Sequence, residues 1–227
     1  MQSLIYYNTV DMTLDQDSYK LITMVWIVLA LLGFIVLKTV NLRPLAWLLV
    51  LVLAVFGCFV TWFHRVPDRN VVADPSAVTS VADGKVVIVQ KAYEGEYLQR
   101  ECIQVSVYMN FFDVHANFWP VDGEITYYKY HPGHYFLAFQ PKASEKNEHS
   151  STCIKSGKGE VFFKQIAGTF ARRIVCYSTV GENEKKGQQC GIIKFGSRID
   201  MFLPLDCDIK VKVGDKVRAC ESVIAVL

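Results

Sequence analysis

Two long apolar runs, separated by a short polar link, dominate the N-terminal part of the chain. Residues 21–37 are apolar except for Thr23, and residues 45–63 are apolar except for Thr61. Runs of about 17 and 19 residues are long enough to cross the hydrocarbon core of a bilayer as helices. The second run is apolar on every side, which is untypical of a helix in a soluble core. The pattern therefore predicts a transmembrane helical hairpin in preference to two buried helices.

The pattern changes after a short polar segment at residues 64–70. Short runs rich in β-branched and aromatic residues follow, separated by Gly, Pro, Asp and Asn, as is typical of strands and turns. The expected strands cover residues 78–89, 102–112, 123–130, 135–139, 160–166, 173–177, 189–195, 199–204 and 209–213, and residues 165–173 fit either a strand or a helix. We predict a membrane-anchoring hairpin at 1–70 and a mainly β domain at 71–227.

An internal repeat narrows the expected fold. Residues 180–187 and 213–220 both begin with Val-Gly followed by an acidic residue, and they align at an offset of roughly 33 residues. A Val-Gly-Asp/Glu turn between strands is similar to the turns of biotinyl and lipoyl carrier domains. We therefore expect a mainly β (α+β) fold with a barrel-sandwich core. Neither copy carries the exposed lysine that such carriers modify.

Composition excludes several functional classes. The formal net charge of +2 gives no support for nucleic-acid binding. The seven cysteines are scattered, odd in number and without a Cys-x-x-Cys pair, so reduced thiols are expected in place of a zinc site or disulfide framework. Residues 1–20 are polar and acidic and have no basic region of the secretory kind, so we expect no signal peptide.

Gly196 and Ser197 form the strongest candidate for chemistry, because they stand between two apolar, strand-like runs. A serine hydroxyl is a poor nucleophile unless a base or a fixed geometry activates it. Glycine permits close approach of another group, so Ser197 Oγ can attack the Gly196 carbonyl carbon. A glycine–serine pair by itself is also typical of a turn or a bulge.

A wider set of motifs resembles the short, membrane-associated class of phosphatidylserine decarboxylase proenzymes. The match runs in order from about Pro67 to the end of the chain. It rests on Ala82-Asp83-Gly84, Asp113-Val114-His115-Ala116-Asn117, His131-Pro132-Gly133, Pro141-Lys142-Ala143-Ser144, Gln165-Ile166-Ala167-Gly168 and Phe195-Gly196-Ser197-Arg198-Ile199-Asp200.

The resemblance implies an enzyme that cuts itself between Gly196 and Ser197. Ser197 then becomes a pyruvoyl cofactor, and the two chains, 1–196 and 197–227, stay partners. The implied reaction converts phosphatidylserine to phosphatidylethanolamine and CO2, with no metal. The competing hypotheses are a non-enzymatic membrane adaptor that displays a lipoyl-like sandwich, and a pyruvoyl enzyme for a soluble amino acid. The two apolar runs count against the second of these.

The resemblance also assigns catalytic roles. It implies that Asp83 and His115 act with Ser197, in the manner of a carboxylate that orients an imidazole. Phe118 stands where longer members have a second histidine, so either His115 serves both steps or His131 is an alternative base. From spacing alone, Asp83 is a turn aspartate before glycine. His131 and His134 have metal-like spacing, but the Pro-Gly between them breaks any helix that would align them, and we predict no metal site.

Candidate residues for the lipid head group are the charged and polar side chains of two of these motif regions. Phosphate and carboxylate groups call for donors such as arginine, and solvated surface charge is the alternative for each candidate. The predicted set is Lys142, Asn147, Arg172 and Arg173. His149 stands where short members often have arginine. Two aromatic pairs, Phe111-Phe112 and Phe118-Trp119, are expected to pack in the core in preference to lining an acyl-chain entrance.

The expected location is the inner cell membrane. Lys20, Arg65 and Arg69 outside the hairpin slightly outweigh Lys38 and Arg43 within its loop, which favours a cytoplasmic β domain. Phosphatidylserine and membrane lipid are the expected partners, together with a possible second copy of the chain and no nucleic acid.

Overall fold

The chain forms two compact units, Met1–Asp68 and Arg69–Leu227. The computed structural model describes residues 12–134, 147–168, 173–194 and 197–227. The expected strand at 135–139 therefore lies outside the described residues, as do Gly196, Arg172 and Lys142. The two units are described separately below.

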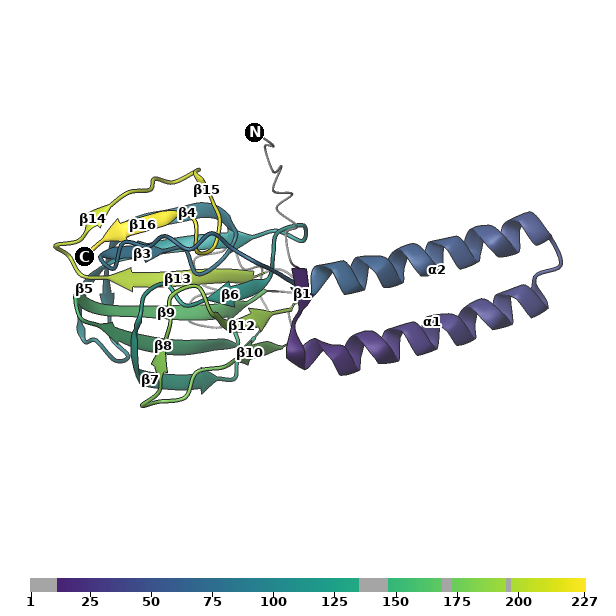
Figure 1. The fold of residues 1–227 in the computed structure, drawn as a ribbon, viewed down its shortest axis with the longest axis horizontal. Coiled ribbons are helices and arrows are strands. Elements are labelled where there is room, and N and C mark those ends of the chain that lie inside the picture. The colour runs from purple at the N-terminus through teal and green to yellow at the C-terminus, as the bar shows by residue number, and fades with distance from the viewer. Residues whose placement is uncertain (1–11, 135–146, 169–172, 195–196) are drawn as a thin grey trace, which may run out of the picture. The chain divides into compact units, whose positions relative to one another are not determined.

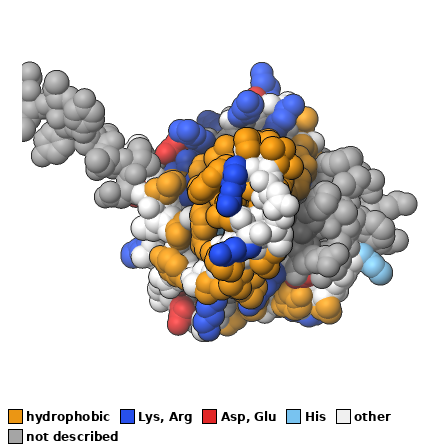
Figure 2. Space-filling view, turned by 90° about the vertical axis from the view of Figure 1, so that its right-hand side faces the viewer, with side chains coloured by type: hydrophobic (Ala, Val, Ile, Leu, Met, Phe, Trp, Pro, Cys, Tyr) orange, Lys and Arg blue, Asp and Glu red, His pale blue; other side chains and the backbone are white. Residues whose placement is uncertain are grey.

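The first unit contains two antiparallel helices, α1 (Tyr19–Thr39) and α2 (Arg43–Phe63), each of 21 residues. A helix of this length measures about 31 Å, close to the thickness of a bilayer core. Within the described part of the chain, these are the two helices that are long and apolar enough to cross a membrane, and this confirms the prediction of two apolar helices. Seen end-on, the hairpin shows hydrophobic side chains around its outside, with Lys and Arg side chains at the end where α1 joins α2 (Figure 2).

Close packing joins the two helices. Gly57 faces Trp26 so closely that an added Cβ would lie 2.9 Å from the indole ring. The indole N–H donates to Thr61 Oγ1 at 3.0 Å, and Thr61 in turn donates to the Gly57 carbonyl at 2.9 Å. The short 3-10 helix η1 (Gln16–Ser18) precedes α1, and β1 (Met12–Leu14) pairs with β2 (Arg65–Pro67). The polar pattern before α1 gave no sign of β1.

The second unit is mainly β, as predicted. An eight-stranded sheet in the order β11-β7-β8-β9-β13-β5-β4-β15 curls into a half-barrel, and two three-stranded sheets accompany it, in the orders β10-β12-β6 and β14-β16-β3 (Figure 1). The strands are β3 (Ala77–Thr79), β4 (Gly84–Glu94), β5 (Arg100–Met109), β6 (Ala116–Phe118), β7 (Gly123–His131), β8 (His149–Ser156), β9 (Gly159–Ala167), β10 (Ile174–Cys176), β11 (Asn183–Glu184), β12 (Gln189–Ile193), β13 (Ser197–Leu203), β14 (Asp208–Ile209), β15 (Lys216–Val217) and β16 (Val223–Val226).

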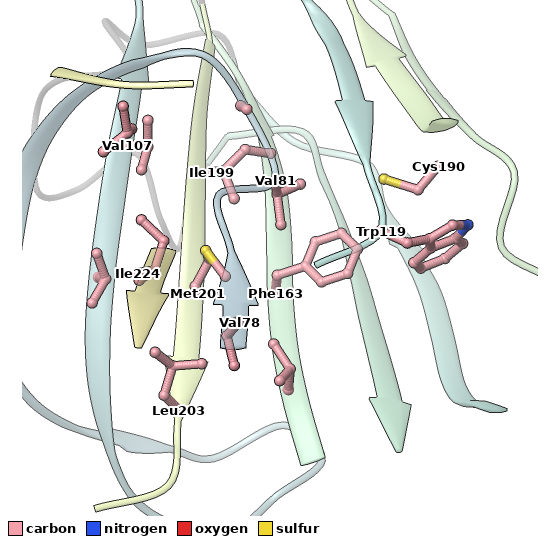
Figure 3. Packing of buried hydrophobic residues seen from close by; sticks show 14 of the residues in the cluster. Val78, Val81, Val107, Trp119, Phe163, Cys190, Ile199, Met201, Leu203 and Ile224 are labelled. Atoms are coloured by element: carbon pink, nitrogen blue, oxygen red, sulfur yellow. The ribbon is translucent and has the colours of Figure 1, made fainter. Parts of the chain in front are cut away.

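The main core lies on one face of this sheet, and a smaller buried cluster of Cys102, Cys153, Phe162 and Phe202 lies on the other. Val107, Ile199 and Met201 come from neighbouring strands, and Trp119 meets Phe163 edge to face with ring centroids 5.9 Å apart (Figure 3). Side chains alternate between the two faces of a strand. Arg198 and Asp200 of β13 therefore lie on the face opposite the main core. Lys164 of β9 lies on that opposite face as well.

The two turns predicted as a repeat make matching hydrogen bonds. Gly181 N donates to Ile125 O at 2.8 Å, and Gly214 N donates to Val86 O at 2.9 Å. Both glycines have positive φ angles, 91° and 103°, which favour glycine at these turns. The repeat extends to the acidic residue before each long strand. Asp122 Oδ1 accepts Lys186 N at 2.9 Å, and Asp83 Oδ1 accepts Ala219 N at 2.9 Å.

Several strand predictions differ from the structure. The expected strand at 78–89 is divided into β3 and β4, and β6, β11, β15 and β16 were not predicted. No strand was predicted at β8, because its buried positions include Ser150, Ser151 and Thr152, and these polar residues do not produce a hydrophobic alternation. Near the C-terminus, β14 (Asp208–Ile209) shares only Ile209 with the expected strand at 209–213. Phe118 and Trp119 are core residues, as predicted. Phe111 and Phe112 are exposed, so the core prediction for this pair is wrong.

Candidate active site around Ser197

Ser197 is the first residue of β13 and is fully buried. Its neighbours across the sheet are Met109 of β5 and Ala167 of β9, so its backbone is held from both sides. The Ser197 hydroxyl lies on the core face, 3.7 Å from the Met109 sulfur. A thioether is a weak acceptor. The hydroxyl therefore makes only a weak hydrogen bond to that sulfur.

A line of buried polar side chains leads to the same sulfur. Asn117 Nδ2 lies 3.9 Å from Met109 Sδ, and Asn117 Oδ1 accepts Gln165 Nε2 at 2.8 Å. Gln165 Oε1 accepts the Ser150 hydroxyl at 2.8 Å. Asn117 and Gln165 belong to motifs recognised in the sequence, but the bond between them was not predicted. Buried polar groups need such partners, because leaving one unsatisfied is costly.

His115 is buried beside the strand that leads to Ser197. Its backbone carbonyl accepts Ile193 N at 3.2 Å, at the end of β12. Its Nδ1 lies 3.0 Å from the Asp113 carbonyl. Because a carbonyl can only accept, Nδ1 carries a hydrogen, so in the neutral ring Nε2 is the nitrogen with the lone pair. The imidazole is therefore held in the tautomer that can take up a proton at Nε2.

Asp83 has a structural role in this arrangement. Its Oδ2 lies 2.7 Å from Arg69 Nη2, and its Oδ1 accepts Ala219 N. The neighbouring Gly84 is required by packing, since an added Cβ would lie 2.3 Å from the Tyr108 carbonyl oxygen. Asp83 precedes β4, which lies two strands from β13, or about 10 Å at the usual strand spacing. A direct bond between Asp83 and His115 stays a prediction.

His131 belongs to a separate cluster on the face of the sheet opposite the main core. Its Nε2 lies 2.5 Å from Glu96 Oε1, and its ring stacks on His149 with centroids 4.3 Å apart. Lys164 Nζ lies 2.9 Å from Glu96 Oε2. Three strand spacings separate β7 from β13, roughly 14 Å. The described contacts therefore bring His115, and not His131, to the Ser197 region.

The charges of this cluster shift two pKa values. Burial alone would raise the pKa of Glu96, but the hydrogen bonds and charge of Lys164, with His131 and Ser151, outweigh it and lower the pKa to about 2. Burial lowers the pKa of His149, and the nearby charges of His131 and Lys164 act in the same direction. Glu96 is therefore ionised at neutral pH and His149 is neutral.

The same cluster has the spacing of a metal site. One donor atom each from Glu96, His131 and His149 lie within 4.8 Å of one another. The ammonium group of Lys164 already supplies a positive charge to the Glu96 carboxylate. An ion-pair network therefore explains the cluster without a metal ion. The absence of a metal from the chemistry stays a prediction.

A buried ion pair follows Ser197 directly and was missed as a functional feature. Arg198 Nε lies 2.8 Å from Asp200 Oδ1, and Nη2 lies 3.0 Å from Oδ2, with both side chains fully buried. The sequence could have indicated this pair, because Arg198 and Asp200 are two positions apart and residues with that spacing lie on one face of a strand. The pair fixes the strand that begins at Ser197.

Two of the predicted head-group residues lie close to this region. Arg173 is exposed, and its carbonyl accepts Lys194 N at 3.2 Å, just before residues 195–196. Asn147 is buried, and its Nδ2 donates to the Ala167 carbonyl at 2.7 Å. Asn147 therefore supports the residue that pairs with Ser197. Arg172, Lys142 and Gly196 lie outside the described residues.

Known proteins of one family are similar to this chain over most of its length. A family model described as phosphatidylserine decarboxylase matches residues 56–225. The chain is 46% identical over 170 residues to the phosphatidylserine decarboxylase proenzyme of Amoebophilus asiaticus, which covers 74% of this chain and 76% of the relative. It is 46% identical over 180 residues to the proenzyme of Nitrosomonas europaea, covering 79% of this chain and 83% of the relative. The chain therefore belongs to the phosphatidylserine decarboxylase family.

Proposed function

We propose that the chain cuts itself between Gly196 and Ser197 and then decarboxylates phosphatidylserine with a pyruvoyl group made from Ser197. Membership of the family makes the chain a carboxy-lyase that is produced as a proenzyme. The observation that carries the residue assignment is the placement of Ser197. It is a buried serine at the first position of a central strand, held by its neighbours on both sides.

The cutting step uses Ser197 as the nucleophile. Its Oγ attacks the Gly196 carbonyl carbon, and the acyl group moves from nitrogen to oxygen to form an ester. Loss of the Ser197 α-proton then expels the Gly196 carboxylate and breaks the chain. The dehydroalanine that remains takes up one water and releases ammonia, leaving the pyruvoyl group. His115 Nε2 is the proposed acceptor for the hydroxyl proton.

The position of Ser197 suits the group that it becomes. When formed, the pyruvoyl group supplies an electron sink for the loss of CO2 from the amino-acid head group. The new chain end stays in place, because β5 and β9 hold the first residue of β13. Protonated His115 returns a proton to the product carbon. We assign both proton steps to His115, since His131 is bonded to Glu96 on the face of the sheet opposite the main core.

Basic and polar side chains near Ser197 are the proposed binding groups for the head group. Arg173 is exposed where its backbone meets Lys194, and its guanidinium suits a phosphate or carboxylate. Asn147 supports the site through Ala167. Arg172 and Lys142 complete the proposed set.

The domain arrangement is also a proposal. We assign residues 1–70 to a membrane anchor and 71–227 to a catalytic domain on the cytoplasmic face of the inner membrane, as a possible homodimer. A barrel-sandwich fold of the biotinyl/lipoyl type is supported by the matched turns. It is also supported by a crossed pair of bonds, from Thr79 N to Pro120 O at 3.1 Å and from Phe118 N to Val81 O at 2.9 Å.

Intact-mass spectrometry and denaturing gels test the proposed chemistry. The purified chain should give fragments 1–196 and 197–227, the second with a pyruvoyl end that borohydride traps. Ser197→Ala should stay in one piece and lack decarboxylase activity. Ser106→Ala is the matched control, because Ser106 is also buried, on the adjacent strand, and should still split. An intact, active wild-type chain would overturn the proposal, and an intact, inactive chain would favour an adaptor.

A further inference from the structure

A rigid turn next to the active site displays two aromatic side chains. Phe111 is 38% exposed and Phe112 is 73% exposed. The turn is fixed by its own polar groups. Asn110 N donates to Asp113 Oδ2 at 2.8 Å, Phe112 N donates to Asn110 Oδ1 at 2.8 Å, and Asp113 N donates to Asn110 O at 3.1 Å. The two phenylalanines therefore project from a held backbone.

The turn follows directly after Met109, the residue that pairs with Ser197. The same edge of the sheet receives the chain that comes from the apolar helices. Arg69 is the first residue of the second unit, and it binds Asp83 at the start of β4. The register of β4 with β5 places Asp83 opposite the turn, because Lys85 pairs with Tyr108. The aromatic pair, Ser197 and Arg69 therefore share one edge.

The length of the connecting chain limits how far this edge can lie from the membrane. Helix α2 ends at Phe63, and six residue steps separate it from Arg69. Six steps of extended chain span about 20 Å at most. The connecting chain is therefore too short to let Arg69 move more than about 20 Å from the end of α2, a helix that is long enough to cross a bilayer.

The charges on this edge suit a lipid surface. Lys85 and Lys216 pair across β4 and β15 at the same end of the sheet, and both are exposed. Exposed lysines beside aromatic side chains attract anionic head groups, while aromatic rings prefer the interfacial layer. Phe111 and Phe112 expose apolar surface to water, and transfer of that surface into lipid would be favourable.

We propose that Phe111 and Phe112 insert into the interfacial layer of a phospholipid bilayer and bring the Ser197 edge into contact with it. This inference rests on the proposed function, since it concerns the route by which a phospholipid enters that site. This lipid contact would be additional to that of the helical hairpin. It would orient the Ser197 edge toward the phospholipid substrate.

Site-specific photocrosslinking tests the contact directly. The full chain, with Ser197→Ala to keep it in one piece, is placed in nanodiscs that contain phosphatidylserine, and Phe112 is replaced by p-benzoylphenylalanine. The matched control is the same replacement at Tyr93, which is 61% exposed but lies near the other end of β4, roughly 30 Å along the strand. We expect a lipid adduct by mass spectrometry at position 112 and none at 93. Equal labelling, or a protein–protein adduct at 112, would overturn the proposal.

A kinetic test uses the mature enzyme. Phe111→Ser/Phe112→Ser should lower the ratio of turnover on bilayer phosphatidylserine to turnover on a monomeric short-chain phosphatidylserine by about tenfold. Tyr93→Ser should leave that ratio at the wild-type value. An unchanged ratio in the double variant refutes the proposal. Failure of the proposed function is distinguishable, because a wild-type chain that neither splits nor turns over leaves the crosslinking result intact.

Discussion

The buried ion pair beside Ser197 permits a quantitative test of what holds the central strand. We consider Arg198→Met, which keeps much of the side-chain length but leaves the Asp200 carboxylate without this guanidinium. Removal of one member of a buried pair costs about 3–5 kcal/mol, because the other charge stays buried. For a unit of this size each kcal/mol corresponds to about 2–4 °C, so the transition should fall by roughly 10 °C.

The double variant Arg198→Met/Asp200→Leu distinguishes the loss of the ion pair from the cost of leaving one charge buried alone. Apolar residues of similar volume can replace a buried pair with little loss or even a gain in stability. We therefore expect most of the lost stability to return. Self-cutting should return with it, because Ser197 and Arg198 point to opposite faces of β13.

The assay has two parts. Thermal unfolding is followed in detergent in a Ser197→Ala background, so that all variants remain one chain, and self-cutting is followed on gels with Ser197 present. If Arg198→Met shifts the transition by less than 2 °C, the ion pair does not hold the strand. If the double variant regains stability but still fails to split, one or both members of the pair take part in the cutting step itself.

Three further predictions concern the residues around the site. Gln165→Leu removes bonds to Asn117 and Ser150 and leaves both buried groups unsatisfied, at about 1–3 kcal/mol each; gels should show slower splitting, and unchanged rates would contradict this. Asp83→Asn should lower the transition temperature through its lost ion pair yet still split, whereas loss of splitting in a stable variant would place Asp83 in the chemistry. The pKa of Glu96 falls from 4.5 to about 2, so the stability it contributes is complete above pH 4.5 and disappears as pH falls toward 2; melting curves should therefore show wild type losing its advantage over Glu96→Gln across that interval, and a constant difference would exclude the ionised pair.

The sequence predicted most elements whose burial follows from local pattern. Two apolar runs became α1 and α2, because a helix satisfies its own backbone while its side chains stay apolar. Runs of β-branched residues became the long strands. The pattern failed at β8, where Ser150 and Thr152 are buried between neighbouring strands, and at Phe111 and Phe112, which are apolar but exposed. Hydrophobicity along the chain does not report where a turn will point.

The site was predictable only as far as motifs could identify it. Ser197 and His115 were predicted as site residues through the motifs that surround them in the sequence, and their catalytic roles stay predictions. The bonds from Gln165 to Asn117 and from Asp83 to Ala219 join segments far apart in the chain, and their partners depend on strand register. Asp83 also shows that a motif residue can serve the fold, since Asp122 makes the same turn contact in the repeat.

The proposed cutting site lies at the start of β13, where a broken chain would stay held by its neighbouring strands. Strand β13 pairs with β5 from Ser197 to Leu203 and with β9 from Ser197 to Phe202, so the new chain end lies inside the sheet. The same short chain supplies β15, which pairs with β4, and β16, which pairs with β3. Backbone pairing and core side chains such as Ile199 and Met201 thus hold the two pieces together without the peptide bond. We therefore expect the proposed cut to change the chemistry at residue 197 while the strands that position this residue keep their register.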